Sequence, residues 1–187
     1  INSYLDLRGD EKKVDEIVLA NIDSPLATAT VSLYGGQILH WQPKCQSEPV
    51  LWSSERIKFQ SGKAIRAGVP ICWPWFGAHP DKSDKPAHGF ARLSSWQLDS
   101  VSTTQSGEIE LCLSMGTVDL RHKDLNFNAD LALRILIGQK LSLTLTTTNT
   151  SHKPLVLTEA FHAYFKVRDI NEINITGLNE CQYIDLL

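Results

Sequence analysis

Apolar and polar residues alternate with a period of two along much of this chain, as expected for strands that bury one face. Residues 108–115 alternate in this way, and so do residues 131–137 and 141–146. A short turn at Gly138-Gln139 lies between the last two runs. These runs therefore predict an antiparallel hairpin.

Shorter runs of the same kind occur at regular intervals. Ala27 to Leu33 and Gln37 to Trp41 flank Tyr34-Gly35-Gly36, which predicts a second hairpin. Further strands are predicted at Val50–Ser53, Trp96–Val101, Pro154–Leu157 and Glu172–Ile175. Helical periodicity is nearly absent, and its one candidate, Asp10 to Ala20, fits a strand equally well. Many short strands at such spacing favour an all-β sandwich or barrel with antiparallel sheets.

Composition narrows the class of protein and of partner. A length of 187 residues with 42% hydrophobic residues suits one domain, residues 1–187. A formal net charge of −3 gives no general attraction to nucleic acid or to an acidic membrane. Local arginines must therefore attract any phosphate, which indicates a small phosphorylated ligand and neither nucleic acid nor membrane as partner.

Cysteine usage and the start of the chain bear on the compartment. Cys45, Cys72, Cys112 and Cys181 are far apart and form no CxxC pair, so we expect buried free thiols and neither a disulfide framework nor a zinc site. Residues 1–15 are polar and charged and lack the apolar core of a signal peptide. No apolar run approaches the length of a membrane helix. The sequence predicts a cytoplasmic protein and carries no signal for its oligomeric state.

Candidate chemistry is concentrated in three short segments: residues 66–77 (RAGVPICWPWFG), 88–92 (HGFAR) and 161–165 (FHAYF). Together they supply the two arginines Arg66 and Arg92, the two histidines His88 and His162, and a set of aromatic rings. Guanidinium groups bind phosphate, imidazole transfers protons and aromatic faces pack on sugar rings. The set suits an anionic, polyhydroxylated small molecule.

Each histidine also has a plainer interpretation. On a strand, His162 shares its face with Tyr164, while Phe161 and Phe165 point the other way, which suits a half-buried pocket. The alternative for His162 is a hydrogen-bonded histidine of the core. His88 precedes Gly89, which permits a tight turn and a close approach to a ligand, but an ordinary loop would look the same.

The arginines and the tryptophan-rich segment have alternatives as well. Arg66 lies among apolar residues, so it must be paired or face a cleft, and a structural salt bridge is the alternative. Arg92 is the second phosphate candidate. We expect most of Trp73-Pro74-Trp75-Phe76 to lie in the core, with one ring lining the site.

The order and spacing of five motifs resemble the aldose 1-epimerase-like superfamily, most closely its hexose-6-phosphate mutarotase branch, also called glucose-6-phosphate 1-epimerase. The motifs are the three segments above together with Tyr34-Gly35-Gly36-Gln37 and Pro49-Val50-Leu51-Trp52. The resemblance runs from about Val31 to Asp185. It implies the β-supersandwich of the galactose-mutarotase-like fold, in which large antiparallel sheets pack face to face.

The resemblance also implies a role for each candidate residue. His162 matches the catalytic acid of the family, and His88 matches its second active-site histidine, which positions the substrate. Arg66 and Arg92 would bind the phosphate or the hydroxyls. The catalytic glutamate and an active-site aspartate of the family come from segments beyond the last residue here, and Asp185 replaces neither. The expectation is a C-terminally truncated chain with the acid half of the site but not the base half.

The function implied is interconversion of the α and β anomers of a hexose 6-phosphate, such as glucose 6-phosphate, with the 187-residue chain inactive by itself. Ring opening and closing requires an acid and a base but no metal and no organic cofactor. Two alternatives stay open at this point. One is a non-catalytic sugar- or phosphosugar-binding module on the same scaffold, and the other is a mutarotase for unphosphorylated aldoses.

Overall fold

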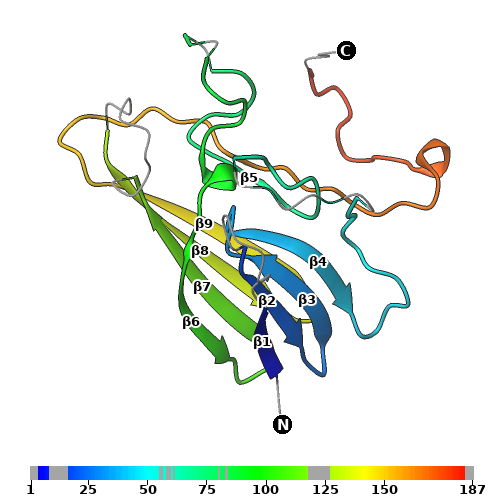
Figure 1. Cartoon of the computed structure of the whole chain (residues 1–187). Helices are drawn as coiled ribbons and strands as arrows, with labels where there is room; N and C mark the ends of the chain where they lie inside the picture. Colours follow the sequence, from blue (N-terminus) through cyan, green and yellow to red (C-terminus); the bar gives the residue numbers. More distant parts are fainter. Residues whose placement is uncertain are drawn as a thin grey trace.

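The structure is a computed structural model, and it describes residues 17–54, 57, 60, 62–79, 81–82, 84–117 and 127–183, with the backbone of residues 4–8. Two four-stranded antiparallel sheets account for most of its regular structure. They pack face to face, as Figure 1 shows. The prediction of an all-β fold with antiparallel sheets is confirmed.

The first sheet has the strand order β1-β2-β3-β4. Its strands are β1 (Tyr4–Arg8), β2 (Leu19–Asp23), β3 (Ala27–Ser32) and β4 (Gln37–Pro43). The turn between β3 and β4 holds Gly35 and Gly36, both at positive φ. A Cβ on Gly36 would lie 2.8 Å from the ring of Trp96, so the predicted hairpin forms here with a glycine that lets the ring pack against backbone.

The second sheet has the order β6-β7-β8-β9. Its strands are β6 (Gln97–Thr103), β7 (Ile109–Gly116), β8 (Ala129–Ile137) and β9 (Leu141–Asn149). The register of the last pair runs from Ile137↔Leu141 to Ala129↔Asn149, which confirms the hairpin predicted from the alternating leucines. The strands β7 and β8 alternate buried and less buried residues along their length.

One apolar core fills the space between the two sheets. It combines buried residues of β2 and β3, such as Ile22 and Val31, with Leu111, Leu133 and Ile135 of β7 and β8. Several tryptophan side chains add polar links: the indole N–H of Trp41 donates to the carbonyl of Gly138 at 3.1 Å, and that of Trp73 donates to Thr147 Oγ1 at 3.1 Å. These contacts join the first half of the chain to the β8–β9 hairpin.

A third layer of mostly irregular chain lies over one end of the sandwich (Figure 1). It contains β5 (Ile71–Cys72), the 3-10 turn η1 (Ala91–Leu93), β10 (Ala160–Phe161) and the 3-10 turn η3 (Ile170–Glu172). The strands β5 and β10 pair antiparallel. Beyond β10, the backbone N–H of Tyr164 donates to Gly68 O at 2.8 Å and that of Lys166 to Val50 O at 2.9 Å. This layer carries all four candidate residues.

Several predicted elements differ from the structure. Residues 50–53 make only isolated bridges, at Leu51 and Ser53, and residues 154–157 and 172–175 are not strands. Residues 50–53 meet their neighbours only at single positions, and residues 154–157 and 172–175 pair with no described strand. Apolar character alone therefore does not produce a continuous ladder. Most of the ambiguous segment Asp10 to Ala20 lies outside the described residues, as does Asp185, but Leu19 and Ala20 belong to β2.

The cysteines are free thiols, as predicted, but they are not all buried. Cys72 is buried and Cys112 is half-buried, whereas Cys45 and Cys181 are exposed. Cys45 lies in the loop after β4 and Cys181 in the segment that follows η3, where little packs against either. Within the described residues, no helix is long and apolar enough to cross a membrane.

Candidate active site

The two candidate histidines come from distant parts of the sequence and meet in the third layer. His162 follows β10, and its backbone N–H donates to Pro70 O at 2.9 Å. His88 lies in the loop that precedes η1. The centroids of the two imidazole rings are 5.7 Å apart, and the ring planes are nearly perpendicular, at 87°. The pairing of β10 with β5 brings His162 close to the loop that carries His88.

Close backbone contacts hold the loop that carries His88. Trp73 N–H donates to His88 O at 3.3 Å, and Phe90 N–H donates to Trp73 O at 2.8 Å. His88 and Gly89 have positive φ, 65° and 71°. A Cβ at position 89 would lie 2.0 Å from Trp73 O, so only glycine allows this approach. Gly89 therefore allows a close contact with the protein's own backbone.

Aromatic rings surround the histidine pair. The ring centroid of Phe76 lies 5.0 Å from that of His88 and 6.4 Å from that of His162. The ring centroids of Tyr164 and His162 are 4.9 Å apart. Phe76 is 48% exposed, whereas Trp73 and Trp75 are buried. The expectation of a mostly buried tryptophan segment is confirmed, and Phe76 is its exposed ring beside the two histidines. The shared face of His162 and Tyr164 also follows the predicted strand parity.

Arg92 extends from η1 toward the same cluster and is half-buried. Its Nη2 donates to the carbonyl of Ala87 at 2.8 Å. Its Nε is buried and has no hydrogen-bond partner among the described residues. An unsatisfied buried donor on a cationic side chain is costly.

Charge interactions link Arg66 to Arg92, Arg92 to His88, and His88 to His162. Burial lowers the pKa of Arg92, and Arg66 lowers it further, while Cys72 and Tyr164 oppose the shift. Burial also lowers the pKa of His88, and Arg92 and His162 add to that effect. These interactions place all four candidates in one cluster, with Arg66 exposed and the other three half-buried.

The cluster contains no balancing negative charge in the described part of the chain. No described carboxylate is among the groups that shift the pKa of His88 or Arg92. No described acidic side chain forms an ion pair with Arg66 or Arg92, so the structural salt bridge considered for Arg66 does not form there. Nor do three His, Cys, Asp or Glu side chains of the described residues gather as they would to hold a metal ion.

An apolar pocket of about 300 Å³ adjoins the cluster through Phe76. The pocket is lined by Pro74, Trp75, Phe76, Ala78, Val156, Leu157 and Thr158. Thr158 also fixes Phe76, because its Oγ1 accepts the backbone N–H of Phe76 at 2.9 Å. The pocket offers apolar surface beside the cationic and titratable groups.

Sequence reasoning missed Cys72 and Gly77 as neighbours of the candidate residues. Cys72 is buried beside Arg92, and burial raises the pKa of its thiol. The backbone N–H of Gly77 donates to His88 Nδ1 at 3.2 Å. Both lie in the segment 66–77 that the sequence singled out, but nothing in the sequence shows which of its residues contact His88 or Arg92.

Comparison with known proteins identifies the family. Residues 19–187 match the model of the family described as aldose 1-epimerase, and the chain belongs to this family. It is 35% identical over 174 residues to an Escherichia coli K12 protein named "Putative glucose-6-phosphate 1-epimerase" and 36% identical over 169 residues to a protein of the same name from Cenchrus ciliaris. The first alignment covers 93% of this chain and 56% of the relative; the second covers 85% and 50%.

Solved structures agree with this assignment. The crystal structure of a "putative mutarotase (YeaD)" from Salmonella typhimurium superposes with a TM-score of 0.75 at 30% identity, over 87% of this chain and 55% of that one. The predicted fold, an antiparallel β-supersandwich of the galactose-mutarotase-like type, is thereby confirmed. The chain spans about half the length of the curated relatives that it matches.

Proposed function

We propose that this chain carries the acid and anion-binding part of an epimerase site that interconverts the α and β anomers of a hexose 6-phosphate. The observation that carries the proposal is the cluster of His88, His162, Arg66 and Arg92, in which no described carboxylate balances the positive charge. The names of the relatives support a phosphorylated hexose as substrate.

Phosphate binding follows from the state of the two arginines. A sugar phosphate provides oxygens that accept charge-assisted hydrogen bonds, and arginine presents donors in a planar fork that fits them. Arg92 is half-buried and forms no ion pair with a described carboxylate, and Arg66 lies near enough for the charges of the two side chains to interact. One bound phosphate would offset the charge of both residues.

The reaction needs two proton movements at the anomeric centre. His162 donates a proton to the ring oxygen while a carboxylate removes the proton of the anomeric hydroxyl, so the bond from the anomeric carbon to the ring oxygen breaks and a carbonyl forms. Rotation of the carbonyl and the reverse proton transfers close the ring as the other anomer. His162 suits the acid because its backbone is fixed while its ring makes no hydrogen bond to any described residue.

The base is the part of this mechanism that the described residues do not provide. A carboxylate near the cluster would act on His88 or Arg92, and none of the described ones does. The 187-residue chain by itself is therefore proposed to bind a phosphorylated sugar without turning it over. The same observation favours a second candidate function, that of a non-catalytic phosphosugar-binding module.

Binding is tested by titrating the chain with glucose 6-phosphate and with glucose. Arg92→Ala should weaken the binding of glucose 6-phosphate about ten- to a hundred-fold, because a lost charge-assisted hydrogen bond costs about 1.5–3 kcal/mol. The same substitution should change the binding of glucose far less. Arg134→Ala is the matched control, since Arg134 pairs with Glu110 on the second sheet. Equal loss for both sugars, or equal loss in both variants, would contradict a phosphate site at Arg92.

Turnover is tested by NMR saturation transfer between the anomers, corrected for spontaneous mutarotation. In a polypeptide extended to the length of the relatives, His162→Ala should lower the rate about 10²- to 10⁴-fold and leave phosphosugar affinity nearly intact, as loss of a proton-transfer group does. The 187-residue chain should show no turnover. Robust turnover by it would mean that Glu159, Asp185 or another of its carboxylates acts as the base.

A further inference from the structure

Two hydrogen bonds clamp His88 to Gly77 across the loop. The backbone N–H of His88 donates to Gly77 O at 2.7 Å, and the backbone N–H of Gly77 donates to His88 Nδ1 at 3.2 Å. One bond fixes the main chain and the other fixes the ring. His88 also has the positive φ of 65°, which is uncommon for a residue other than glycine and which these bonds help to hold.

The second bond determines where the imidazole carries its proton. A backbone N–H only donates, so Nδ1 must present its lone pair, and a neutral imidazole then carries its hydrogen on Nε2. We propose that His88 is locked by Gly77 as the neutral Nε2–H tautomer and that this N–H is a fixed hydrogen-bond donor to an oxygen of the ligand. The inference rests on the proposed function for the identity of the ligand, but not for the tautomer.

The groups around His88 also favour its neutral form. The charged and titratable groups that act on it are Arg92, from η1, and His162, from the segment after β10, and the ring of Phe76 packs beside it. Burial and both of these groups lower the pKa of His88. Protonation would place a further positive charge in the cluster and break the bond from Gly77, so two independent effects disfavour it.

The two histidines therefore have different capacities. Nδ1 of His88 is occupied, so His88 can orient a ligand oxygen but is poorly suited to accept and release protons. The ring of His162 packs against Tyr164 and makes no hydrogen bond to a described residue, which leaves both of its nitrogens available. Gly77 acts through His88 and is a positioning residue. This explains how two adjacent imidazoles can avoid performing the same function.

The tautomer is tested directly by ¹⁵N NMR of the ligand-free chain labelled at histidine. Nδ1 of His88 should resonate as an unprotonated ring nitrogen and Nε2 as a protonated one, at neutral pH and at the mildly acidic end of the range where the chain is folded. Assignment uses the spectrum of His88→Asn. The same signals can be read by solid-state NMR if the chain associates. A proton on Nδ1, or an imidazolium at neutral pH, would overturn the inference.

The donor role is tested with His88→Gln and His88→Asn. The glutamine amide reaches the position of Nε2 and can donate there, whereas the asparagine side chain ends near Nδ1 and can only replace the acceptor for Gly77. Asparagine tolerates positive φ better than glutamine. The Asn variant should therefore be the more stable of the two, and the Gln variant should bind the ligand more tightly.

Affinity is measured with glucose 6-phosphate and, separately, with inorganic phosphate. The affinity of the Asn variant should be about ten-fold or more below that of the unchanged chain, as expected when a donor to a charged oxygen is removed. The affinity of the Gln variant should fall less. Equal or tighter binding by the Asn variant would show that position 88 is merely structural. If the unchanged chain binds neither probe, the proposed ligand and the donor role fail, while the NMR result still decides the tautomer.

Discussion

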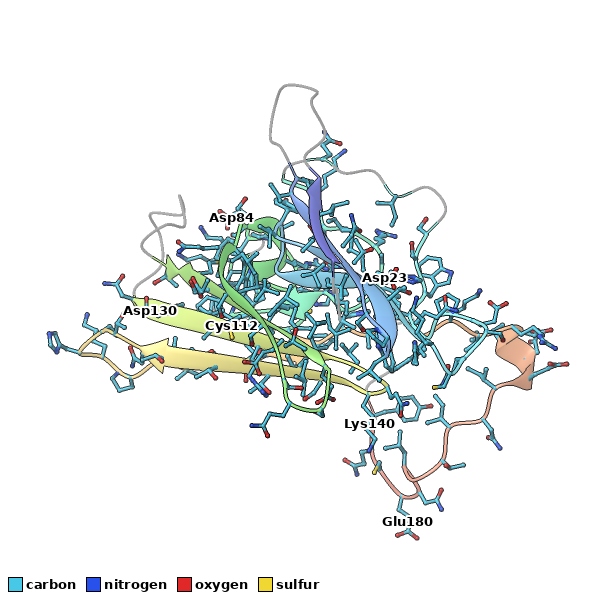
Figure 2. The ribbon with its side chains drawn as sticks, turned by 90° about the horizontal axis from the view of Figure 1, so that it is seen from below. Asp23, Asp84, Cys112, Asp130, Lys140 and Glu180 are labelled. Atoms are coloured by element: carbon cyan, nitrogen blue, oxygen red, sulfur yellow. The ribbon has the colours of Figure 1, made fainter. Side chains whose placement is uncertain are left out.

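The two packed sheets and the segment of residues 151–183 both contain large apolar side chains, but they bury them very differently. Leu133 and Ile135 of β8 are 1% and 0% exposed. In the later segment Leu178 and Ile175 are 64% and 75% exposed. Figure 2 shows the segment around Glu180 extending away from the two sheets, and Figure 1 shows the same course in orange to red.

The difference lies in what faces each strand. The buried residues of β8, among them Leu131 and Leu133, share one apolar core with buried residues of β2, β3 and β4. The segment from Thr158 to Lys166 hydrogen-bonds to residues 50–76, but most of its side chains face no second layer. Apolar residues stabilise a fold only where another apolar surface covers them.

The candidate site lies at the boundary between these two regions. His88 and Arg92 come from the part backed by the sandwich, while His162 and Tyr164 come from the exposed segment. One side of the site is therefore held by core packing, and the other is held mainly by hydrogen bonds to Gly68 and Pro70. The following experiments test whether the regions differ as strongly in energy as in exposure.

The same truncation in each region gives the largest expected contrast. Leu133→Ala should lower the free energy of unfolding by about 2–5 kcal/mol, because it leaves a cavity in the core. Leu178→Ala should change it by no more than about 0.5 kcal/mol, as is usual for exposed sites. Urea unfolding followed by fluorescence measures both. Comparable losses would mean that a further surface covers Leu178 in solution.

Replacing two glycines of positive φ by alanine separates the cost of close packing from the cost of backbone strain. Gly89 and Gly177 share the strain of that conformation, at φ 71° and 89°. A Cβ at position 89 meets the backbone of Trp73, whereas one at position 177 meets nothing within 4 Å. Gly89→Ala should therefore cost about 1–3 kcal/mol more than Gly177→Ala in the same unfolding measurement. Equal costs would show that the loop can move away from Trp73.

Self-association should follow from the exposed apolar side chains of the later segment. Val156, Phe165 and Ile175 are among the large apolar residues that lie open to solvent. Uncovered apolar surface on extended chain favours pairing with another copy. Sedimentation velocity should show species larger than the 20.9 kDa monomer, shifted toward monomer by Phe165→Glu. Thr146→Glu, on β9, is the control that should leave association unchanged. A monodisperse, cooperatively melting monomer would contradict this prediction.

A smaller effect concerns pH. Burial lowers the pKa of His40, on β4, below its usual value of 6.5, and His88 shifts in the same direction. The unfolded chain then binds protons before the folded chain does, so stability falls as pH drops below about 6.5. Thermal melting between about pH 8 and pH 5.5 should show this decline. His40→Gln, which cannot titrate, should make the decline shallower, and an unchanged slope would show that His40 does not contribute.

Much of the sandwich could be predicted from local pattern. Alternation over 108–115 and 131–146 predicts β7, β8 and β9 with the correct inward faces, because a strand that buries one face needs a period of two. The glycine pair at 35–36 predicts the β3–β4 turn. The pattern fails at 154–157 and 172–175, where apolar residues occur without a facing strand.

The sequence by itself determined the residue types of the candidate site and the strand parity that puts His162 and Tyr164 on one face. Only the tertiary structure decided which of these groups meet. The antiparallel pairing of β5 with β10 joins residues about ninety positions apart, and backbone hydrogen bonds from Trp73 to His88 and from Phe90 to Trp73 hold the loop of His88 beside this pair. The exposure of individual thiols and the bond from Gly77 to His88 were decided in the same way. Local pattern reflects burial along one strand, whereas charge, tautomer and ligand contact depend on neighbours that the fold brings from elsewhere in the chain.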